Sequence, residues 1–141
     1  MSAPELISRL FQARTAAHMA HLRTKSYAEH KALDEFYNEI IELADEFAET
    51  YQGFFGLMDY PAVPQPTGKP VDWINALREW CKQNRNAICK GESVLENLLD
   101  SIMGFCAQIV YKLKFLDSGC ADMDGGGDMP MPDGFMKMAK W

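Results

Sequence analysis

The chain has 141 residues, of which 48% are hydrophobic and 24% are charged, so it is a globular domain and not a disordered protein. Its net charge of −6, without a basic tail, argues against a protein that coats nucleic acid. The sequence lacks the roughly 20 consecutive apolar residues of a membrane span, and its start lacks the long apolar run of a signal peptide.

The first predicted helix begins at Ser2-Ala3-Pro4-Glu5 and ends near Arg23. A capping serine, a proline in the first turn and an early acid are typical of a helix start. Apolar residues recur on one face with the helical period, and two histidines share that face. The residues of this face are Leu6, Ile7, Leu10, Phe11, Ala17, His18 and His21.

The second predicted helix runs from Tyr27 to Gln52, with Ser26 as its N-cap and Gly53 as its stop. Four potential metal ligands lie along one flank of its apolar stripe, at the border of the core. These are His30, Asp34, Asp45 and Glu49.

Residues 53–70 contain four prolines and predict a long crossover, which allows the second and third helices to run parallel. The third helix is expected from Asp72 to about Lys90, ended by Gly91. The fourth is expected from Glu92 or Ser93 to Leu116. The bundle is therefore assigned to residues 1–117.

Residues 118–141 predict a flexible, acidic, methionine-rich tail. Its end has the composition of a docking peptide for a phage or host protein, with Phe135, Met136, Lys137 and Trp141 as the contact residues. A frayed terminus is the alternative interpretation.

The four cysteines predict a reducing compartment. Cys81, Cys89, Cys106 and Cys120 are far apart and form no CxxC pair, which is poor spacing for a zinc site. With no sign of export, we expect reduced, mostly buried thiols in a cytoplasmic protein.

The histidine and carboxylate spacing predicts a metal site built from two copies of the chain. Fifteen residues separate His30 from Asp45, which is about 22 Å on a straight helix, too far for one ion to touch both. A shared site requires two antiparallel copies. Imidazole and carboxylate together suit ferrous iron, zinc and manganese. His18 and His21, at i and i+3, could also reach one ion. The alternative is that the histidines are core-edge residues and that the carboxylates are solvated.

Two segments resemble the mini-ferritins, the Dps-type starvation proteins: HLRTKS at 21–26 and EHKALDEFY at 29–37. In that family one His ends the first helix, a second His opens the next helix, and an Asp follows four residues later. Asp45 and Glu49 fit the family's later Asp-x-x-x-Glu pair at the family spacing from His30. Leu98-Leu99 and residues 111–113 add weaker similarity. The likeness spans roughly residues 5–52 and 92–116. The chain also resembles a group of small phage-encoded proteins of unassigned function.

The resemblance implies an all-α, ferritin-like four-helix bundle that forms a dimer or a larger shell. It makes His21, His30 and Asp34 ligands from one subunit and Asp45 and Glu49 ligands from its two-fold mate. It implies ferrous iron, oxidised by peroxide or oxygen at a carboxylate-bridged pair of irons. The competing expectation is a phage structural or host-interaction protein that kept the bundle without metal chemistry, in the host cytoplasm or the virion.

Overall fold

The computed structural model describes residues 2–116, which form four helices and no strand. The helices are α1 (Ala3–Arg23), α2 (Tyr27–Phe55), α3 (Pro70–Cys89) and α4 (Ser93–Phe115). The expectation of an all-α fold with four helices is confirmed.

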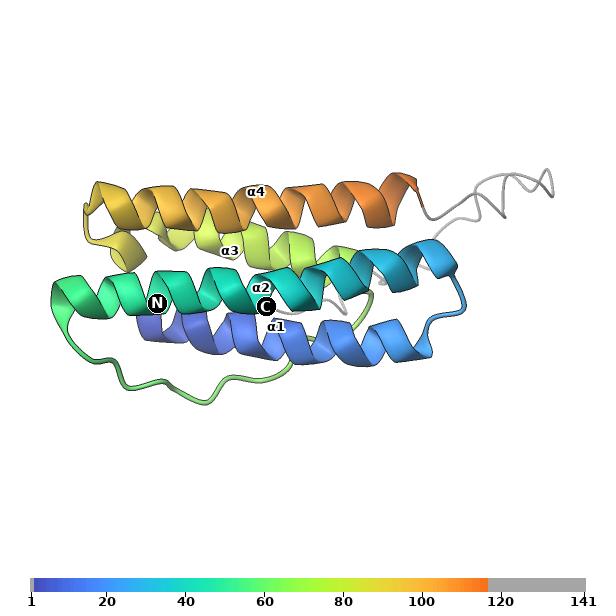
Figure 1. The fold of residues 1–141 in the computed structure, drawn as a ribbon, viewed down its shortest axis with the longest axis horizontal. Coiled ribbons are helices and arrows are strands. Elements are labelled where there is room, and N and C mark those ends of the chain that lie inside the picture. Colours follow the sequence, from blue (N-terminus) through green and yellow to red (C-terminus); the bar gives the residue numbers. More distant parts are fainter. Residues whose placement is uncertain (1, 117–141) are drawn as a thin grey trace.

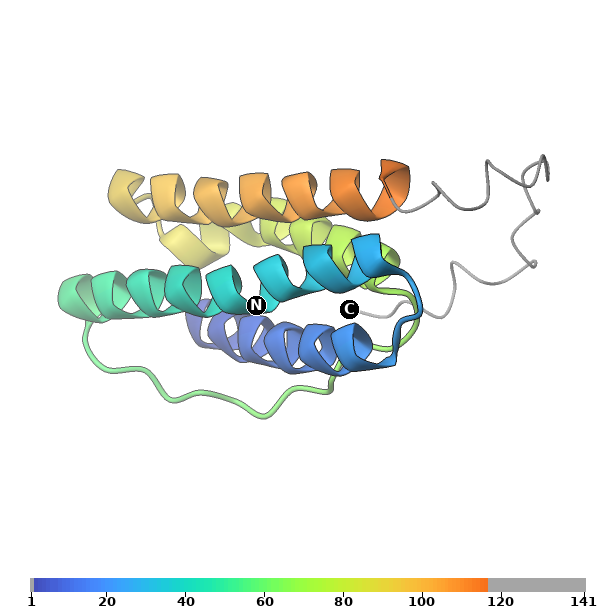
Figure 2. The same cartoon turned by 45° about the vertical axis from the view of Figure 1, so that its right-hand side comes forward.

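The helices form two antiparallel hairpins, α1–α2 and α3–α4, as Figures 1 and 2 show. Residues 56–69 run back along the bundle without helix, so α2 and α3 run in the same direction (Figure 1). The main packing pairs are α1–α2, α3–α4, α2–α4 and α1–α3. The helices on each diagonal of the bundle are therefore α1 with α4 and α2 with α3.

The predicted helix starts are borne out at α1 and α2 and are two residues late at α3. Ser26 caps α2, because its hydroxyl oxygen accepts a hydrogen bond from the Glu29 backbone N–H at 3.2 Å. Ser2 occupies the N-cap position of α1, but its side chain makes no capping hydrogen bond. Helix α3 begins at Pro70 and not at Asp72, since a proline has no N–H to lose in the first turn.

The predicted stop of α2 at Gly53 is wrong. The helix continues to Phe55 and is capped by Gly56 at φ 94°, a backbone conformation that glycine adopts at little cost. Gly53 lies within the last turns of α2 and lowers the stability of the helix by about 1 kcal/mol relative to alanine. The ring of Phe55 contacts the ring of Tyr51 at 5.0 Å, and this contact within the last turn favours continuation of the helix past the glycine.

The core is a single apolar cluster to which all four helices contribute. Phe36 of α2 packs edge-on against Trp73 of α3 and stacks on Phe105 of α4, with ring centroids 6.0 and 5.9 Å apart. Each large apolar side chain that is fully buried in this way contributes roughly 1.5–3 kcal/mol to the stability of the folded state. The fully buried large side chains include Leu6, Leu10, Phe36, Ile40, Trp73, Leu77, Leu95 and Ile102.

Three cysteines, Cys81, Cys89 and Cys106, are free and buried, and their burial agrees with prediction. The reducing compartment stays a prediction. Burial raises the pKa of Cys89 to about 11 and that of Cys106 to about 12, and it raises the pKa of Cys81 further still. These thiols are therefore apolar core residues. Cys120 lies outside the described residues.

One helix in the described part of the chain, α4, has the length and apolar composition of a membrane span. The same composition is found in core helices of water-exposed bundles, and α4 buries Leu95, Leu99, Ile102, Cys106, Ile109 and Leu113 against the other helices. The expectation of a protein without a membrane span stays a prediction.

Candidate functional site

The end of α1 and the start of α2 hold a pair of histidines in a reciprocal arrangement. The imidazoles of His21 and His30 stack with centroids 3.7 Å apart and planes 18° apart. The Nδ1 of His21 lies 2.8 Å from the carbonyl oxygen of His30, and the Nδ1 of His30 lies 2.9 Å from the carbonyl oxygen of His21. His21 is only 9% exposed, and His30 is partly buried.

These contacts determine which ring nitrogen carries the proton. A carbonyl oxygen only accepts, so Nδ1 donates in both rings. In the neutral form of each histidine, Nε2 therefore keeps its lone pair. An Nδ1–H bond to a carbonyl is also the usual way in which proteins orient a histidine that binds metal through Nε2. The sequence identified both histidines, but it gave no sign of this mutual bonding.

Asp34 lies one turn along α2 from His30, and two neighbours hold one of its oxygens. The Tyr37 hydroxyl donates to Asp34 Oδ1 at 2.8 Å, and the Asn38 amide contacts the same oxygen at 3.3 Å. The Tyr37 hydrogen bond lowers the pKa of Asp34 below its ordinary value, and nearby His21 acts in the same direction. The same bond raises the pKa of Tyr37.

The Tyr37 ring also joins the histidines of α1 to this group. His18 stacks on it with centroids 4.0 Å apart and planes 11° apart, and the His21 ring forms a T-shaped contact with it at 5.2 Å. His18 is exposed and lies 5.9 Å from His21 between ring centroids. Sequence reasoning missed Tyr37, although its i+3 spacing from Asp34 places the two on one face of the helix.

Asp45 and Glu49 lie further along α2 and do not meet the histidines within one chain. Both are exposed and not at the border of the core, where we expected them, because Ala44, Phe47 and Ala48 take the inward positions of this stretch. They line a shallow groove of about 480 Å³ on α2, and the groove is mostly acidic. Its other lining residues are Glu39, Glu42, Leu43 and Glu46.

Within residues 2–116 of a single chain, the structure contains no group of three or more His, Cys, Asp or Glu side chains arranged to hold a metal ion. The histidine stacking gives a reason. The Nε2 lone pair lies in the ring plane, and two nearly parallel planes 3.7 Å apart do not converge on one ion. The two rings therefore do not share one ion, and an ion bound to either Nε2 would need its other ligands from elsewhere.

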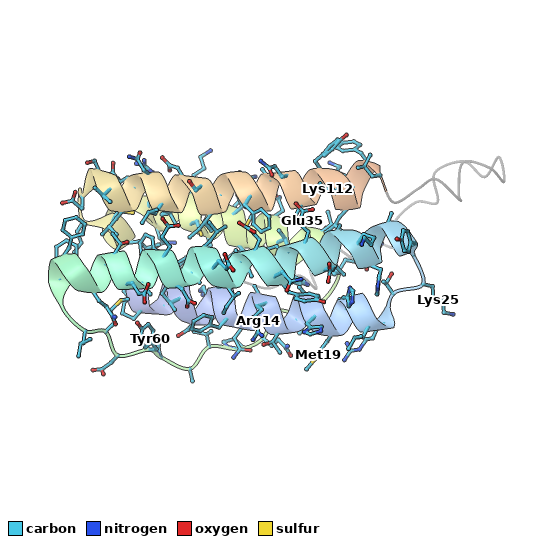
Figure 3. All side chains as sticks on the ribbon, viewed as in Figure 1. Arg14, Met19, Lys25, Glu35, Tyr60 and Lys112 are labelled. Atoms are coloured by element: carbon cyan, nitrogen blue, oxygen red, sulfur yellow. The ribbon has the colours of Figure 1, made fainter. Side chains whose placement is uncertain are left out.

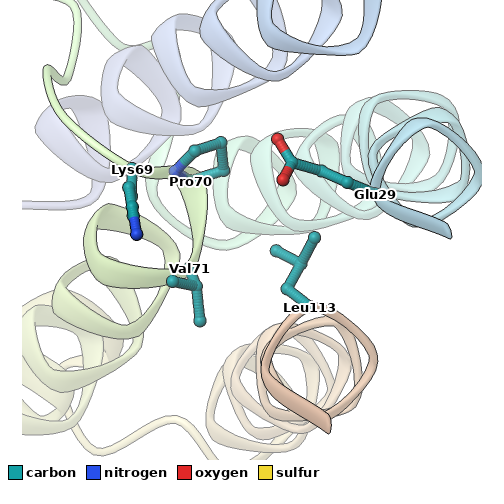
Figure 4. Close-up of a pocket in the computed structure, with 5 residues that line it drawn as sticks. All are labelled: Glu29, Lys69, Pro70, Val71 and Leu113. Carbon is teal, nitrogen blue, oxygen red and sulfur yellow. The ribbon is translucent and has the colours of Figure 1, made fainter. Parts of the chain in front are cut away.

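Two other hollows have no arrangement of catalytic groups. One of about 270 Å³ lies at the end of the bundle and is lined by Glu29, Lys69, Pro70, Val71 and Leu113 (Figure 4). The other, of about 540 Å³, lies between the start of α2 and the end of α4, beside the ion pair of Glu35 and Lys112 labelled in Figure 3.

The predicted docking residues Phe135, Met136, Lys137 and Trp141 lie outside the described residues. The described residues do include large exposed apolar side chains at the end of the bundle where α4 ends. They are Leu22, Tyr27, Tyr111, Phe115 and Leu116, each more than half exposed.

Comparison with known proteins gives two matches. Residues 21–113 match the model of a family of unknown function, DUF5856. The chain is 32% identical over 112 residues to an uncharacterized 14.6 kDa protein of the mobD-ri intergenic region of Enterobacteria phage T4. That alignment covers 79% of this chain and 88% of the phage protein. No solved structure matches the chain. The family match begins at His21 and includes His30, Asp34, Asp45 and Glu49.

Proposed function

Since the chain belongs to the DUF5856 family, whose function is unknown, we propose a function from the chain's own candidate site. Two copies of a ferritin-like bundle bind ferrous iron between them, and the protein sequesters or oxidises that iron. The ferritin-like assignment is supported by the connectivity. Two antiparallel hairpins joined by one long crossover, with α2 and α3 parallel, is the arrangement of ferritin-like bundles (Figure 1).

The observation that carries the proposal is the reciprocal histidine pair. Two imidazoles that hydrogen-bond through Nδ1 keep their Nε2 lone pairs available for a metal, and, besides the Tyr37 hydrogen bond, both histidines act to lower the pKa of Asp34. A mixed set of imidazole and carboxylate ligands fits ferrous iron, and also zinc and manganese. His18, exposed against Tyr37, is an additional candidate ligand.

The missing carboxylates are proposed to come from a second copy. Asp45 and Glu49 are exposed and lie about 22 Å or more along α2 from His30, so they cannot complete the site in their own chain. Two antiparallel α2 helices would bring the acidic groove of one chain against the histidine end of the other. Charge complementarity favours this pairing, because imidazoles and bound cations would face the groove carboxylates.

Ferrous iron is the substrate in this proposal. Two ferrous ions each give one electron to one peroxide molecule, which takes up two protons and becomes two water molecules. Within the protein, His21 and His30 bind through Nε2, and Asp34, Asp45 and Glu49 balance the cationic charge. Carboxylates in the site also stabilise the additional positive charge of the oxidised ions.

The second candidate function is a phage structural or host-interaction protein that uses the same bundle without metal. The similarity to a T4 phage protein and the exposed apolar residues at the end of the bundle favour it. Such a protein would use Leu22, Tyr27 and Phe115, together with the tail, as its contact surface.

The deciding experiment measures the metal content per subunit and the molecular mass in solution. The samples are natively purified wild-type protein, two single variants, and a heterodimer that carries one variant in each chain. His30→Ala and Glu49→Ala homodimers should each lose bound iron, whereas Glu35→Ala, a matched carboxylate change on the same helix, should keep it. A heterodimer of one His30→Ala chain and one Glu49→Ala chain should recover half of the wild-type content, since one of its two shared sites is intact.

Two outcomes contradict the proposal. A heterodimer without any metal would place the ligands within one chain. If wild-type protein neither carries iron nor takes up added ferrous iron, only the second candidate function remains. A pull-down from host extract, with wild-type protein and with the Leu22→Ala and Phe115→Ala variants, would then test it.

A further inference from the structure

The two oxygens of Asp34 are not equivalent. Tyr37 donates its hydroxyl hydrogen to Oδ1 at 2.8 Å, and the Asn38 amide approaches the same Oδ1 at 3.3 Å. Among the described residues, no hydrogen-bond donor contacts Oδ2. Asn38 is primarily bound to the Asp34 backbone carbonyl, 2.9 Å away, so Tyr37 supplies the stronger contact to the carboxylate.

We propose that Tyr37 is a positioning residue for cation binding: it occupies Oδ1 of Asp34 and leaves Oδ2 as the single oxygen available to a cation. This inference rests on the function proposed above. Residues that hydrogen-bond to a ligand fix its orientation, and their loss commonly costs 10–100-fold in metal affinity. A carboxylate that is free to rotate could instead bind through both oxygens or turn to solvent.

The position of the Tyr37 ring supports this role. It contacts two rings of α1: that of His18, stacked at 4.0 Å, and that of His21, which is 80° to its plane at 5.2 Å. The hydroxyl is therefore carried by a ring that is itself held against α1. One side chain thus ties the carboxylate of α2 to the histidines of α1, and it does so without being a ligand.

The substitution Tyr37→Phe separates the hydroxyl from the ring, because phenylalanine keeps the ring that packs on His18 and His21. Tyr27→Phe is the matched control. Tyr27 also lies beside His30, with ring centroids 6.4 Å apart, but it is exposed and its hydroxyl does not hydrogen-bond to Asp34.

The experiment uses Co²⁺ alone as the probe, added to the full-length, metal-free protein, with affinity from titration calorimetry and ligand geometry from the visible absorption of the bound ion. We expect Tyr37→Phe to weaken Co²⁺ binding about 10–100-fold and to change the absorption spectrum. Tyr27→Phe should match the wild type, and Asn38→Ala should have a smaller effect than Tyr37→Phe. The thermal midpoints of the metal-free variants should remain close together, which separates positioning from a general loss of structure.

Two results overturn the inference, and they differ in what they imply for the proposed function. If Tyr37→Phe binds Co²⁺ with wild-type affinity and spectrum while His30→Ala does not bind it, the positioning role is wrong and the metal site stands. If His30→Ala binds Co²⁺ as well as the wild type does, both the site and the role of Tyr37 are wrong.

Discussion

His21 and His30 each donate a hydrogen bond to the backbone carbonyl of the other, across the turn that joins α1 to α2. Two side-chain-to-backbone hydrogen bonds therefore link residues that are nine positions apart in the chain, and the two imidazole rings stack on each other. The carbonyl of His21 belongs to the last turn of α1, where carbonyl groups lack partners within the helix. The pair therefore closes the hairpin as well as forming the candidate site.

This relationship predicts the stability of the metal-free protein. His30→Ala removes one hydrogen bond and the stacking contact, so we expect a loss of about 1–2 kcal/mol in the free energy of unfolding. His18→Ala, which changes an exposed residue, should cost less. Urea denaturation of both variants, at equal protein concentration and with a chelator present, checks this. Equal midpoints for the two variants would contradict the closing role of the pair.

Substitution at the aromatic centre of the core should lower the free energy of unfolding by more than His30→Ala does. Phe36 is fully buried and contacts rings of α3 and α4, so Phe36→Ala should cost about 3–5 kcal/mol. Phe115→Ala removes the same ring from a position that is 62% exposed and should change stability by less than about 0.5 kcal/mol. Thermal and urea unfolding of the two variants measure the contrast. Similar losses would mean that Phe115 is covered in solution, for example by a second copy.

The three buried thiols predict slow chemical modification. In a Cys120→Ser variant, Cys81, Cys89 and Cys106 should react with a thiol reagent roughly a hundredfold more slowly in the native protein than in denatured protein. Burial raises their pKa values and keeps the reactive thiolate scarce. The time course of colour release at neutral pH gives the rate. Fast release from one native thiol would show that its helix opens readily.

The ion pair between α3 and α4 predicts a pH dependence. Arg85 contacts both oxygens of Asp100 at 2.8 Å, and this lowers the pKa of Asp100 below its ordinary value of 3.8. A lowered folded-state pKa gives stability that is fully present above the ordinary value and is lost as the pH falls through the folded value. Wild type should therefore exceed Asp100→Asn in stability at neutral pH.

Urea unfolding across a pH series tests this. The difference between wild type and Asp100→Asn should close as the pH falls below the ordinary value of 3.8. Glu96→Gln, whose carboxylate is 3.6 Å from Arg85, is the control and should show a smaller difference. A difference that stays constant with pH would assign the effect to packing and not to charge.

The helices could be predicted from the sequence because apolar periodicity and caps act locally. The ends of α4 and the capping of α2 by Ser26 agree with prediction. The predicted stop at Gly53 does not, because the helix free energy lost to one glycine is smaller than the stabilisation that the last turns of α2 provide. His21, His30 and Asp34 were predicted as metal ligands from residue type, spacing and family resemblance, and that role stays a prediction. Their mutual hydrogen bonds, and the contact of Tyr37 with Asp34, depend on how two helices meet and leave no periodic signal. The helical periodicity also predicted Asp45 and Glu49 at the border of the core, whereas both side chains are exposed.

The connection over residues 56–69 has a consequence for how the chain holds together. It lies largely on the surface, held by hydrogen bonds of Met58 and Tyr60 to Gln52 and by the buried Pro66. Each hairpin keeps its own turn, so a protease cut within this connection would leave α1–α2 and α3–α4 as two complete fragments. The core interface between them is large enough that we expect the nicked halves to stay associated, and separately expressed halves to reassemble.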